Sequence, residues 1–157
     1  MSSAFANNEE IVRAARHRLP QDAWNYLVGA SESETTMRRN RLALDRTALI
    51  PRVLVDVSNV DASTTLMGLP LRTPVILAPM GSLQRFSPGG GADSTRAAAA
   101  FGSLHVVSSA TEPGLVKIAE AADYPKIFQL YIHGDWAWTE EKLAQIKAAG
   151  YVGLCIT

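Results

Sequence analysis

Small polar residues recur where four successive apolar segments of the sequence end. In chain order, they are Pro79-Met80-Gly81, Ser108-Ser109, Gln129 followed by Tyr131, and Thr157. Each residue alone is typical of a turn or strand end, but the recurrence favours a shared site. The set is neutral and rich in hydrogen-bonding groups, so it suits a flat polar heterocycle better than a metal, which takes clustered His, Cys or carboxylate ligands. The set has no paired nucleophile and base, which disfavours hydrolase chemistry.

None of the three histidines stands out as a catalytic base. His17 lies among arginines and is expected at the surface, whereas His105 falls inside an apolar segment, where packing or hydrogen bonding is expected. His133 follows the third segment and has no visible partner. The Gly89-Gly90-Gly91 run could suggest phosphate binding before a helix. It lacks a Walker lysine and a GxGxxG pattern, so we interpret it as a flexible loop over the site.

An α/β alternation must bring these strand ends together. From Pro74 onward we expect strands at 75–78, 104–108, 127–131 and 152–156, and helices at 92–101, from Thr111-Glu112-Pro113, and from Asp135 to Gly150. This pattern predicts a parallel α/β fold, in which the strand C-termini share one edge. An eight-stranded barrel needs about 250 residues. Four units are therefore half a TIM barrel or a small open sheet, and a stop at Thr157 is expected to reflect truncation.

Residues 1–73 are expected to form a helical segment followed by a small hairpin. Two helices are predicted within 8–28 with a break at Leu19-Pro20, and a third at 33–44. An extended stretch at 49–56 and a hairpin at 63–71, turning at Gly68, should follow. The arginines of the third helix are interpreted as a solvated or ion-paired face. Residues 74–157 would then be the second domain.

The composition indicates a soluble globular protein. Fifteen basic and fifteen acidic residues among 157 give zero net charge, so no nucleic-acid partner is expected. The single cysteine, Cys155, excludes a disulfide framework and favours the cytoplasm. No apolar run approaches the roughly 20 residues of a membrane span. The start, MSSAFANNEE, lacks the features of a signal peptide.

Several separated segments resemble the FMN-dependent α-hydroxy-acid oxidases and dehydrogenases, such as glycolate oxidase, lactate oxidase and mandelate dehydrogenase. The segments are WNYLVGASES, RRNRLAL, IPRVLVDVSNVDASTTLMG, PVILAPMG, SPGG, VVSSAT, FQLY and GLCIT. Their order and spacing carry the resemblance, which runs from about Leu19 to Thr157. The resemblance implies a TIM (β/α)8 barrel with FMN at the C-terminal strand ends. The chain is similar to the N-terminal half, with its helical segment and about four βα units.

The resemblance also implies roles for the strand-end residues. The backbone at Pro79, Met80 and Gly81 would lie along the flavin near its N5 edge. Ser108, Gln129 and Thr157 would hydrogen-bond the polar edge of the flavin, whose donors and acceptors they match.

Two tyrosines would be catalytic residues by the same resemblance. Tyr26 would bind the substrate carboxylate and Tyr131 would lie near the substrate hydroxyl. The implied reaction oxidises a small L-2-hydroxy acid, with lactate among the candidates, to the 2-oxo acid. The family's histidine base, arginine pair and lysine belong to the C-terminal half. The chain should therefore need that half for activity, and a homo-oligomer, commonly a tetramer, is implied.

Three departures from the family pattern bear on the site. Ser87-Pro88-Gly89-Gly90-Gly91 stands where the family usually has HPxGE, and Ala110 replaces a frequent aromatic residue, which should open the substrate pocket. Gly81 stands where some members have alanine, which favours dehydrogenase over oxidase behaviour. Two alternatives stay open: another FMN barrel such as an isomerase, or a non-catalytic half-barrel that serves as an interaction piece.

Overall fold

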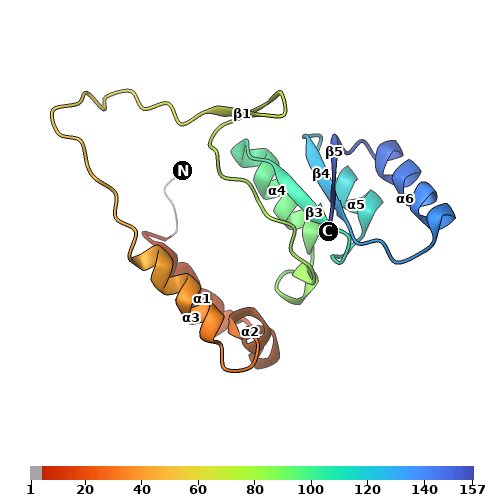
Figure 1. Ribbon diagram of the computed structural model, residues 1–157, viewed down its shortest axis with the longest axis horizontal. Coiled ribbons are helices and arrows are strands. Elements are labelled where there is room, and N and C mark those ends of the chain that lie inside the picture. The colour runs from red at the N-terminus through yellow and green to blue at the C-terminus, as the bar shows by residue number, and fades with distance from the viewer. Residues whose placement is uncertain (1–4) are drawn as a thin grey trace. The chain divides into compact units, whose positions relative to one another are not determined.

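A computed structural model describes residues 5–157, so the first four residues of the MSSAFANNEE start lie outside the described part. Contacts divide the chain into two compact units, Met1–Asn59 and Val60–Thr157. Within residues 5–157, the first unit contains helices only and the second contains both helices and strands (Figure 1). The hairpin groups with the sheet, so this division falls earlier than the expected boundary between residues 73 and 74. No helix within residues 5–157 is long and apolar enough to cross a membrane.

The first unit contains the three expected helices. They are α1 (Asn8–Arg18), α2 (Gln21–Val28) and α3 (Thr35–Asp45). The side chain of Asn7 caps α1 by accepting a 3.0 Å hydrogen bond from the Glu10 backbone N–H. Acidic residues in the first turn of α1 and basic residues in its last turn complement the helix dipole.

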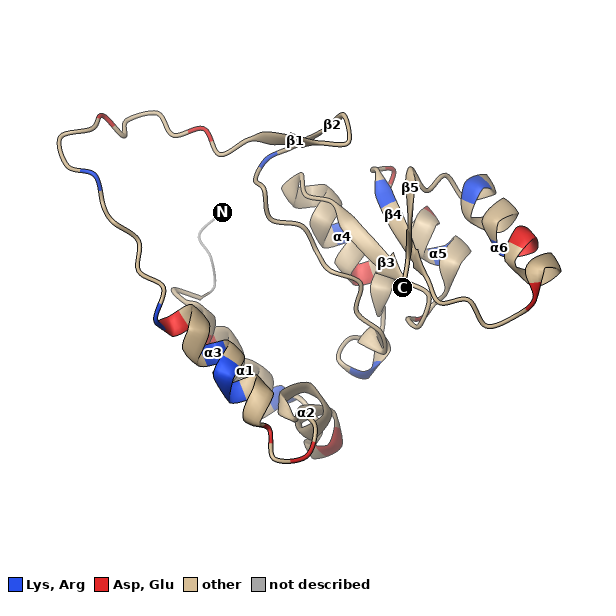
Figure 2. Cartoon of the chain, viewed as in Figure 1, with Lys and Arg blue, Asp and Glu red and all other residues tan. Residues whose placement is uncertain are grey.

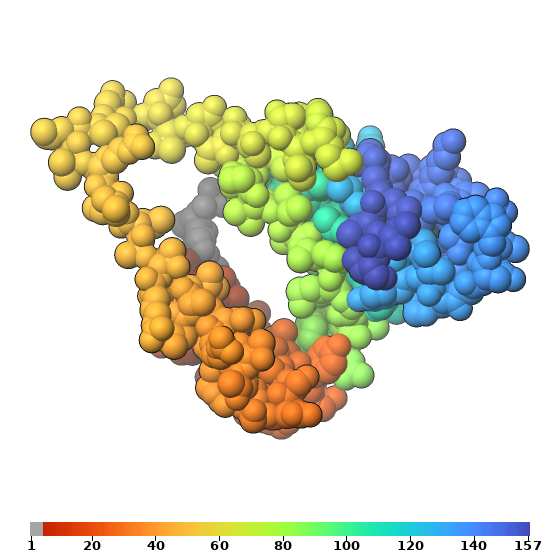
Figure 3. Space-filling view, viewed as in Figure 1, coloured from red at the N-terminus to blue at the C-terminus, as the bar shows by residue number. Residues whose placement is uncertain are grey.

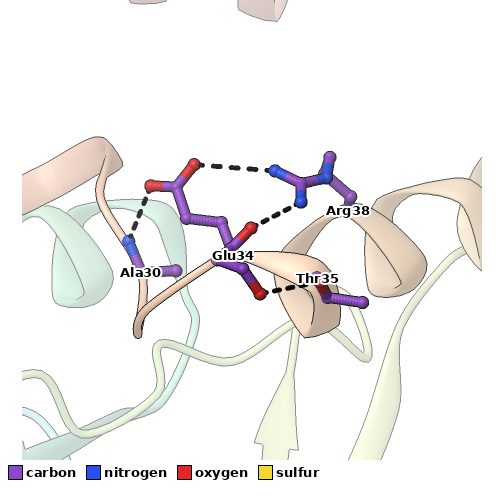
Figure 4. A network of polar contacts seen from close by, with 5 residues as sticks. Ala30, Glu34, Thr35 and Arg38 are labelled. Atoms are coloured by element: carbon purple, nitrogen blue, oxygen red, sulfur yellow. Dashed lines mark hydrogen bonds and ion pairs between the residues drawn. The ribbon is translucent and has the colours of Figure 1, made fainter.

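Two arginines of α3 form ion pairs with neighbouring carboxylates, which agrees with the predicted solvated or ion-paired face. Glu34 precedes the helix with φ of 57°, and its carboxylate accepts from the Ala30 N–H at 3.3 Å. The same carboxylate lies 3.9 Å from the Arg38 guanidinium (Figure 4). Arg41 pairs with Asp45 one turn later. The expected extended stretch after α3 carries no helix or strand, and Leu49 in it is 93% exposed.

The second unit begins with the predicted hairpin, formed by β1 (Thr64–Leu66) and β2 (Leu69–Leu71). Met67 and Gly68 make the turn with φ of 52° and 78°. Two positive φ values fit a two-residue turn whose twist matches its strands, and Gly68 adopts this conformation without strain.

A three-stranded parallel sheet follows in the order β3-β4-β5. Helices alternate with its strands, which confirms the predicted parallel α/β class. The elements are α4 (Gly91–Phe101), β3 (His105–Ser108), α5 (Leu115–Glu120), β4 (Lys126–Leu130), α6 (Trp136–Ala148) and β5 (Gly153–Ile156). A short 3-10 turn, Leu83–Arg85, precedes α4. The register pairs Ser108 with Gln129, and Gln129 with Cys155.

The expected buried strand at 75–78 is wrong. Only Leu77 forms a parallel bridge, with His105, and Val75 is 66% exposed. The Leu77 N–H donates to the Leu104 carbonyl and the Leu77 carbonyl accepts from the Val106 N–H. Within residues 5–157, nothing pairs with the other edge of this segment. Because this segment is paired on one side only, its apolar side chains stay exposed and it does not form a continuous strand.

Two apolar clusters cover opposite faces of the sheet. On one face Val107 and Phe128 pack with Ile118 of α5 and Ile146 of α6. On the other face lie Leu104, Val106 and Ile127, which pack with the hairpin residues Leu69 and Leu71. Successive strand residues point to opposite faces. Strands covered on both faces read as continuous apolar runs, which explains the sequence pattern of β3 and β4.

Charged side chains avoid the sheet, except at Lys126 (Figure 2). β3 and β5 carry no Asp, Glu, Lys or Arg. Lys126 begins β4 and is only 6% exposed. Its ammonium donates to the carbonyls of Ala119 and Ala122 at 3.1 and 2.9 Å. Lys126 therefore caps carbonyl groups at the end of α5, and its burial lowers its pKa.

The start of α5 differs from expectation and the start of α6 agrees with it. α5 begins at Leu115 after Gly114, so Thr111 does not cap it. Gly114 has φ of 92°, a conformation that precludes helix there. At α6, the Asp135 side chain accepts from the Trp138 N–H at 2.9 Å, as a helix cap does.

Candidate functional site

A hydrogen-bonded row of side chains lies at the C-terminal ends of β3, β4 and β5. The Ser108 hydroxyl donates to Gln129 Oε1 at 3.0 Å, and Gln129 Nε2 donates to Thr157 Oγ1 at 2.7 Å. Ser108 and Gln129 are 3% and 2% exposed, whereas Thr157 is exposed. The parallel register pairs Ser108 with Gln129, and Thr157 lies two residues beyond Cys155, the partner of Gln129, so the structure brings together three residues that the sequence singled out. We call Ser108, Gln129 and Thr157 the polar row.

The polar row keeps donors available for a ligand. Ser108 Oγ also accepts from the Ala110 N–H at 3.1 Å, which fixes the direction of its own proton toward Gln129. The Gln129 amide has two N–H donors and gives one to Thr157. Its second N–H and the Thr157 hydroxyl proton have no acceptor within residues 5–157. Donors beside acceptors fit the carbonyl and imide groups of a flat heterocycle.

The segment Pro79-Met80-Gly81 lies beside the row, next to the loop that follows β3. The Ser82 N–H donates to the Ala110 carbonyl at 2.9 Å. A Cβ added at Gly81 would lie 3.3 Å from Ala110 Cβ and 3.4 Å from its carbonyl oxygen. The two small residues therefore meet closely, and Met80 is left 47% exposed. We call Pro79-Met80-Gly81 the shelf.

Tyr131 follows β4 at the same edge of the sheet. Its N–H donates to Ser109 Oγ at 3.2 Å, which joins the ends of β3 and β4. Tyr131 is 43% exposed, and the centroid of its ring lies 6.1 Å from that of the His133 ring. The His133 ring in turn lies edge-on, 6.3 Å from Trp138. Tyr26, the other predicted catalytic residue, belongs to α2 in the first unit and is 56% exposed.

The glycine run is tightly packed, contrary to its interpretation as a flexible loop. Gly90 and Gly91 are buried, and Gly90 has φ of 52°. The Gly91 N–H donates to the Glu112 carbonyl at 2.8 Å. A Cβ at Gly90 would lie 2.3 Å from the Glu112 oxygen, and one at Gly91 would lie 2.7 Å from Ile118 Cδ1. The glycines let two backbones and a helix approach closely, so their role is packing.

The histidines occupy the positions expected of them. His105 is 2% exposed and its Nδ1 lies 2.9 Å from Thr95 Oγ1, so it is a packed, hydrogen-bonded residue. Burial lowers the pKa of His105 to about 4, which keeps it neutral at pH 7. His17 is exposed on α1, and His133 is exposed in the loop after β4. Within residues 5–157, no three His, Cys, Asp or Glu residues cluster as metal ligands.

Two residues beside the shelf were missed by sequence reasoning. The Thr111 hydroxyl accepts from the Leu83 N–H at 3.3 Å, and Gln84 Oε1 accepts from the Glu112 N–H at 3.2 Å. Thr111 is 5% exposed, although the sequence predicted it as a helix cap. No local pattern marks either residue, because the contact joins loops that are 28 residues apart in the chain.

A hollow beside α5 and α6 has a volume of about 410 Å³, and no residue of the polar row lines it. It is lined by residues near the ends of those helices, including Val116, Ala119 and Ala149. The candidate site at the strand ends is therefore separate from this hollow.

Comparison with known proteins identifies the family. Residues 15–157 match the model of a family described as FMN-dependent dehydrogenase. The chain belongs to this family, which confirms the resemblance seen in its sequence.

Individual relatives agree. A peroxisomal (S)-2-hydroxy-acid oxidase of Oryza sativa subsp. indica is 34% identical over 151 residues, which cover 96% of this chain and 41% of the relative. An L-lactate oxidase of Nostoc sp. is 35% identical over 159 residues, covering 99% of this chain and 44% of the relative. The chain thus spans less than half the length of the relatives it matches.

Solved structures share the fold. A structure described as a lactate oxidase of Pediococcus acidilactici matches with a TM-score of 0.90 and 29% identity, over 99% of this chain and 44% of that one. A mandelate oxidase structure matches with a TM-score of 0.89 and 27% identity, over 98% and 44% of the respective chains.

Proposed function

We propose that this chain is the N-terminal half of a TIM-barrel flavoenzyme that oxidises a small L-2-hydroxy acid to the 2-oxo acid with FMN. The polar row at the C-terminal ends of three parallel strands, with the shelf next to the loop that follows β3, is the observation that supports the proposal. Family membership supports the cofactor. The names of the relatives, which are hydroxy-acid, lactate and mandelate oxidases, support the substrate class.

Residues 74–157 would supply the first part of the barrel and would need a C-terminal half to complete it. The outer edge of β5 is unpaired within the described chain, and Leu154 and Ile156 are 39% and 61% exposed. The dark-blue end of the chain, which includes β5, is open to view in Figure 3. Further strands and helices, such as the relatives' remaining length could provide, would cover this apolar surface.

The residues present fit FMN. The second N–H of Gln129 and the hydroxyl of Thr157 would donate to the ring's carbonyl groups, while Ser108 holds the Gln129 amide in orientation. The backbone of the shelf would lie along the ring. When bound, FMN would supply the two-electron redox chemistry, and the protein would position it and tune its electronics.

The two tyrosines would act on the substrate. The hydroxyl of Tyr26 would bind the carboxylate and that of Tyr131 would lie at the substrate hydroxyl, since a phenol donates a hydrogen bond without adding charge. None of His17, His105 and His133 is proposed as the base. His105 in particular is buried, neutral and bonded to Thr95. The chain alone is therefore proposed to be inactive.

We also propose that the protein is located in the cytoplasm and forms a homo-oligomer. The lone cysteine supports a reducing compartment. The oligomer rests on family likeness. One relative is peroxisomal by name, so fluorescent tagging of the complete protein tests the location directly.

Purification of the complete polypeptide tests the cofactor. We expect a yellow protein that releases FMN on denaturation. A colourless protein, or one that releases FAD, would contradict the proposal. For the 157-residue chain by itself we expect only weak FMN retention, because part of the phosphate site would be missing.

A further inference from the structure

The loop at residues 82–91 is tied to the loop after β3. Ser82 and Gly91 donate their N–H groups to the carbonyls of Ala110 and Glu112, at 2.9 and 2.8 Å. The Glu112 N–H donates in return to Gln84 Oε1 at 3.2 Å. Contacts from both ends of one segment to three consecutive residues restrain the segment as a unit.

Thr111 lies at the centre of these contacts and is 5% exposed. Its hydroxyl accepts from the Leu83 N–H at 3.3 Å and lies 3.5 Å from Gln84 Oε1, to which it can donate. Its methyl group borders Gly91, since a Cβ added there would lie 2.9 Å from Thr111 Cγ2. Both ends of the side chain therefore contact the same loop.

We propose that Thr111 is a positioning residue that holds the shelf against the polar row through its hydroxyl. Gly81 is bonded directly to Ser82, and Ala110 directly to Thr111, so a shift of the tied loops would carry the shelf with it. Ser108 also bonds the Ala110 N–H, which links the same loop to the row. As far as the ligand is concerned, this inference rests on the proposed FMN site.

A packing role and a positioning role for Thr111 make opposite predictions. Thr111→Val keeps the branched shape and removes the hydroxyl, whereas Thr111→Ser keeps the hydroxyl and removes the methyl group. If Thr111 only fills space, valine is tolerated and serine is harmful. If its hydroxyl positions the loop, valine is harmful and serine preserves function.

The full 157-residue chain is the material for the test. Amide hydrogen exchange at Ser82 and Leu83 measures the restraint of the loop, and titration with FMN measures the site. Thr139→Val is the matched control, because Thr139 is also buried and its hydroxyl donates to the Asp135 carbonyl at 2.9 Å, in α6. Thermal melting of each variant shows that it folds.

For Thr111→Val we expect about five-fold faster exchange at Leu83 and about five-fold weaker FMN binding, the loss typical of one hydrogen bond. Thr111→Ser should match the wild type, and Thr139→Val should change neither quantity. Unchanged exchange in Thr111→Val, or equal effects in the control, would overturn the inference. If exchange follows this pattern while even the complete wild-type protein has no FMN affinity, the FMN site fails and the loop restraint stands.

Discussion

At the residue scale, three side chains, Ser108, Gln129 and Thr157, carry the hydrogen-bonding groups of the polar row. Gln129 is both acceptor and donor within the row, so it sets the orientation of its two neighbours. It is also among the largest fully buried side chains. A buried amide that is hydrogen-bonded on both sides is tolerated in a core, but its removal leaves the Ser108 hydroxyl without an acceptor and the Thr157 hydroxyl without its donor.

Substitution of Gln129 tests this dependence. Gln129→Leu removes both hydrogen bonds and leaves the buried Ser108 hydroxyl without its acceptor. We expect a loss of about 1–3 kcal/mol in the free energy of unfolding and loss of FMN binding. The control is Gln145→Leu on α6, where the amide is only partly buried and its partners, Lys142 and Glu141, are charged side chains of the same helix. Denaturant unfolding that shows equal losses in both variants would contradict the role of Gln129.

His105 gives a second prediction at this scale. Its pKa is lowered from 6.5 to about 4 by burial, so the folded state binds its proton less readily than the unfolded state. Stability from this residue is complete above pH 6.5 and is lost as the pH falls toward about 4. Carboxyl groups with lowered pKa, such as Asp93, titrate from 3.8 downward and so act in a lower window.

The measurement for His105 is the free energy of unfolding as a function of pH. It should decline between pH 6.5 and 4 in the wild type, and the decline should be smaller in His105→Gln. A flat profile over this range in the wild type would show that the histidine is not held neutral by the fold.

At the element scale, the glycine run shows what the sequence could and could not predict. The position of Gly89-Gly90-Gly91 before a helix was evident, and α4 indeed begins at Gly91. The reason for the glycines was not evident, because Glu112 and Ile118 approach them from another part of the chain. Local patterns predict elements, whereas the contacts between loops depend on the assembled fold.

Two glycine substitutions separate packing from backbone conformation. Gly90→Ala would place a Cβ 2.3 Å from the Glu112 oxygen at a φ of 52°, whereas Gly68→Ala meets no atom within 4 Å at a φ of 78°. We expect a loss of about 1 kcal/mol for Gly68→Ala from φ alone. Gly90→Ala should cost at least about twice as much, because strain and overpacking add. Equal losses of thermal stability in the two variants would contradict this prediction, because the loop around Gly90 would then accommodate the added Cβ without further strain.

At the scale of the whole molecule, the sequence predicted the helices, the hairpin and the parallel sheet. The spacing of apolar residues marks the helices, and Leu19-Pro20 and Asp135 mark helix boundaries. Gly68 marks the turn of the hairpin. The segment at 75–78 was not predicted correctly, because its burial depends on a neighbour at its outer edge. Parallel topology predicted that Ser108, Gln129 and Thr157 lie at one edge of the sheet. The contacts of Thr111 could not be predicted, because they join two loops that are far apart in the sequence.

The most direct measurement is anaerobic addition of L-lactate, glycolate or mandelate to the purified complete protein, with the flavin spectrum recorded. We predict that at least one of these 2-hydroxy acids bleaches the flavin and yields the matching 2-oxo acid. A flavin that stays oxidised with all three would contradict the central claim and would favour another FMN-barrel chemistry, such as isomerisation.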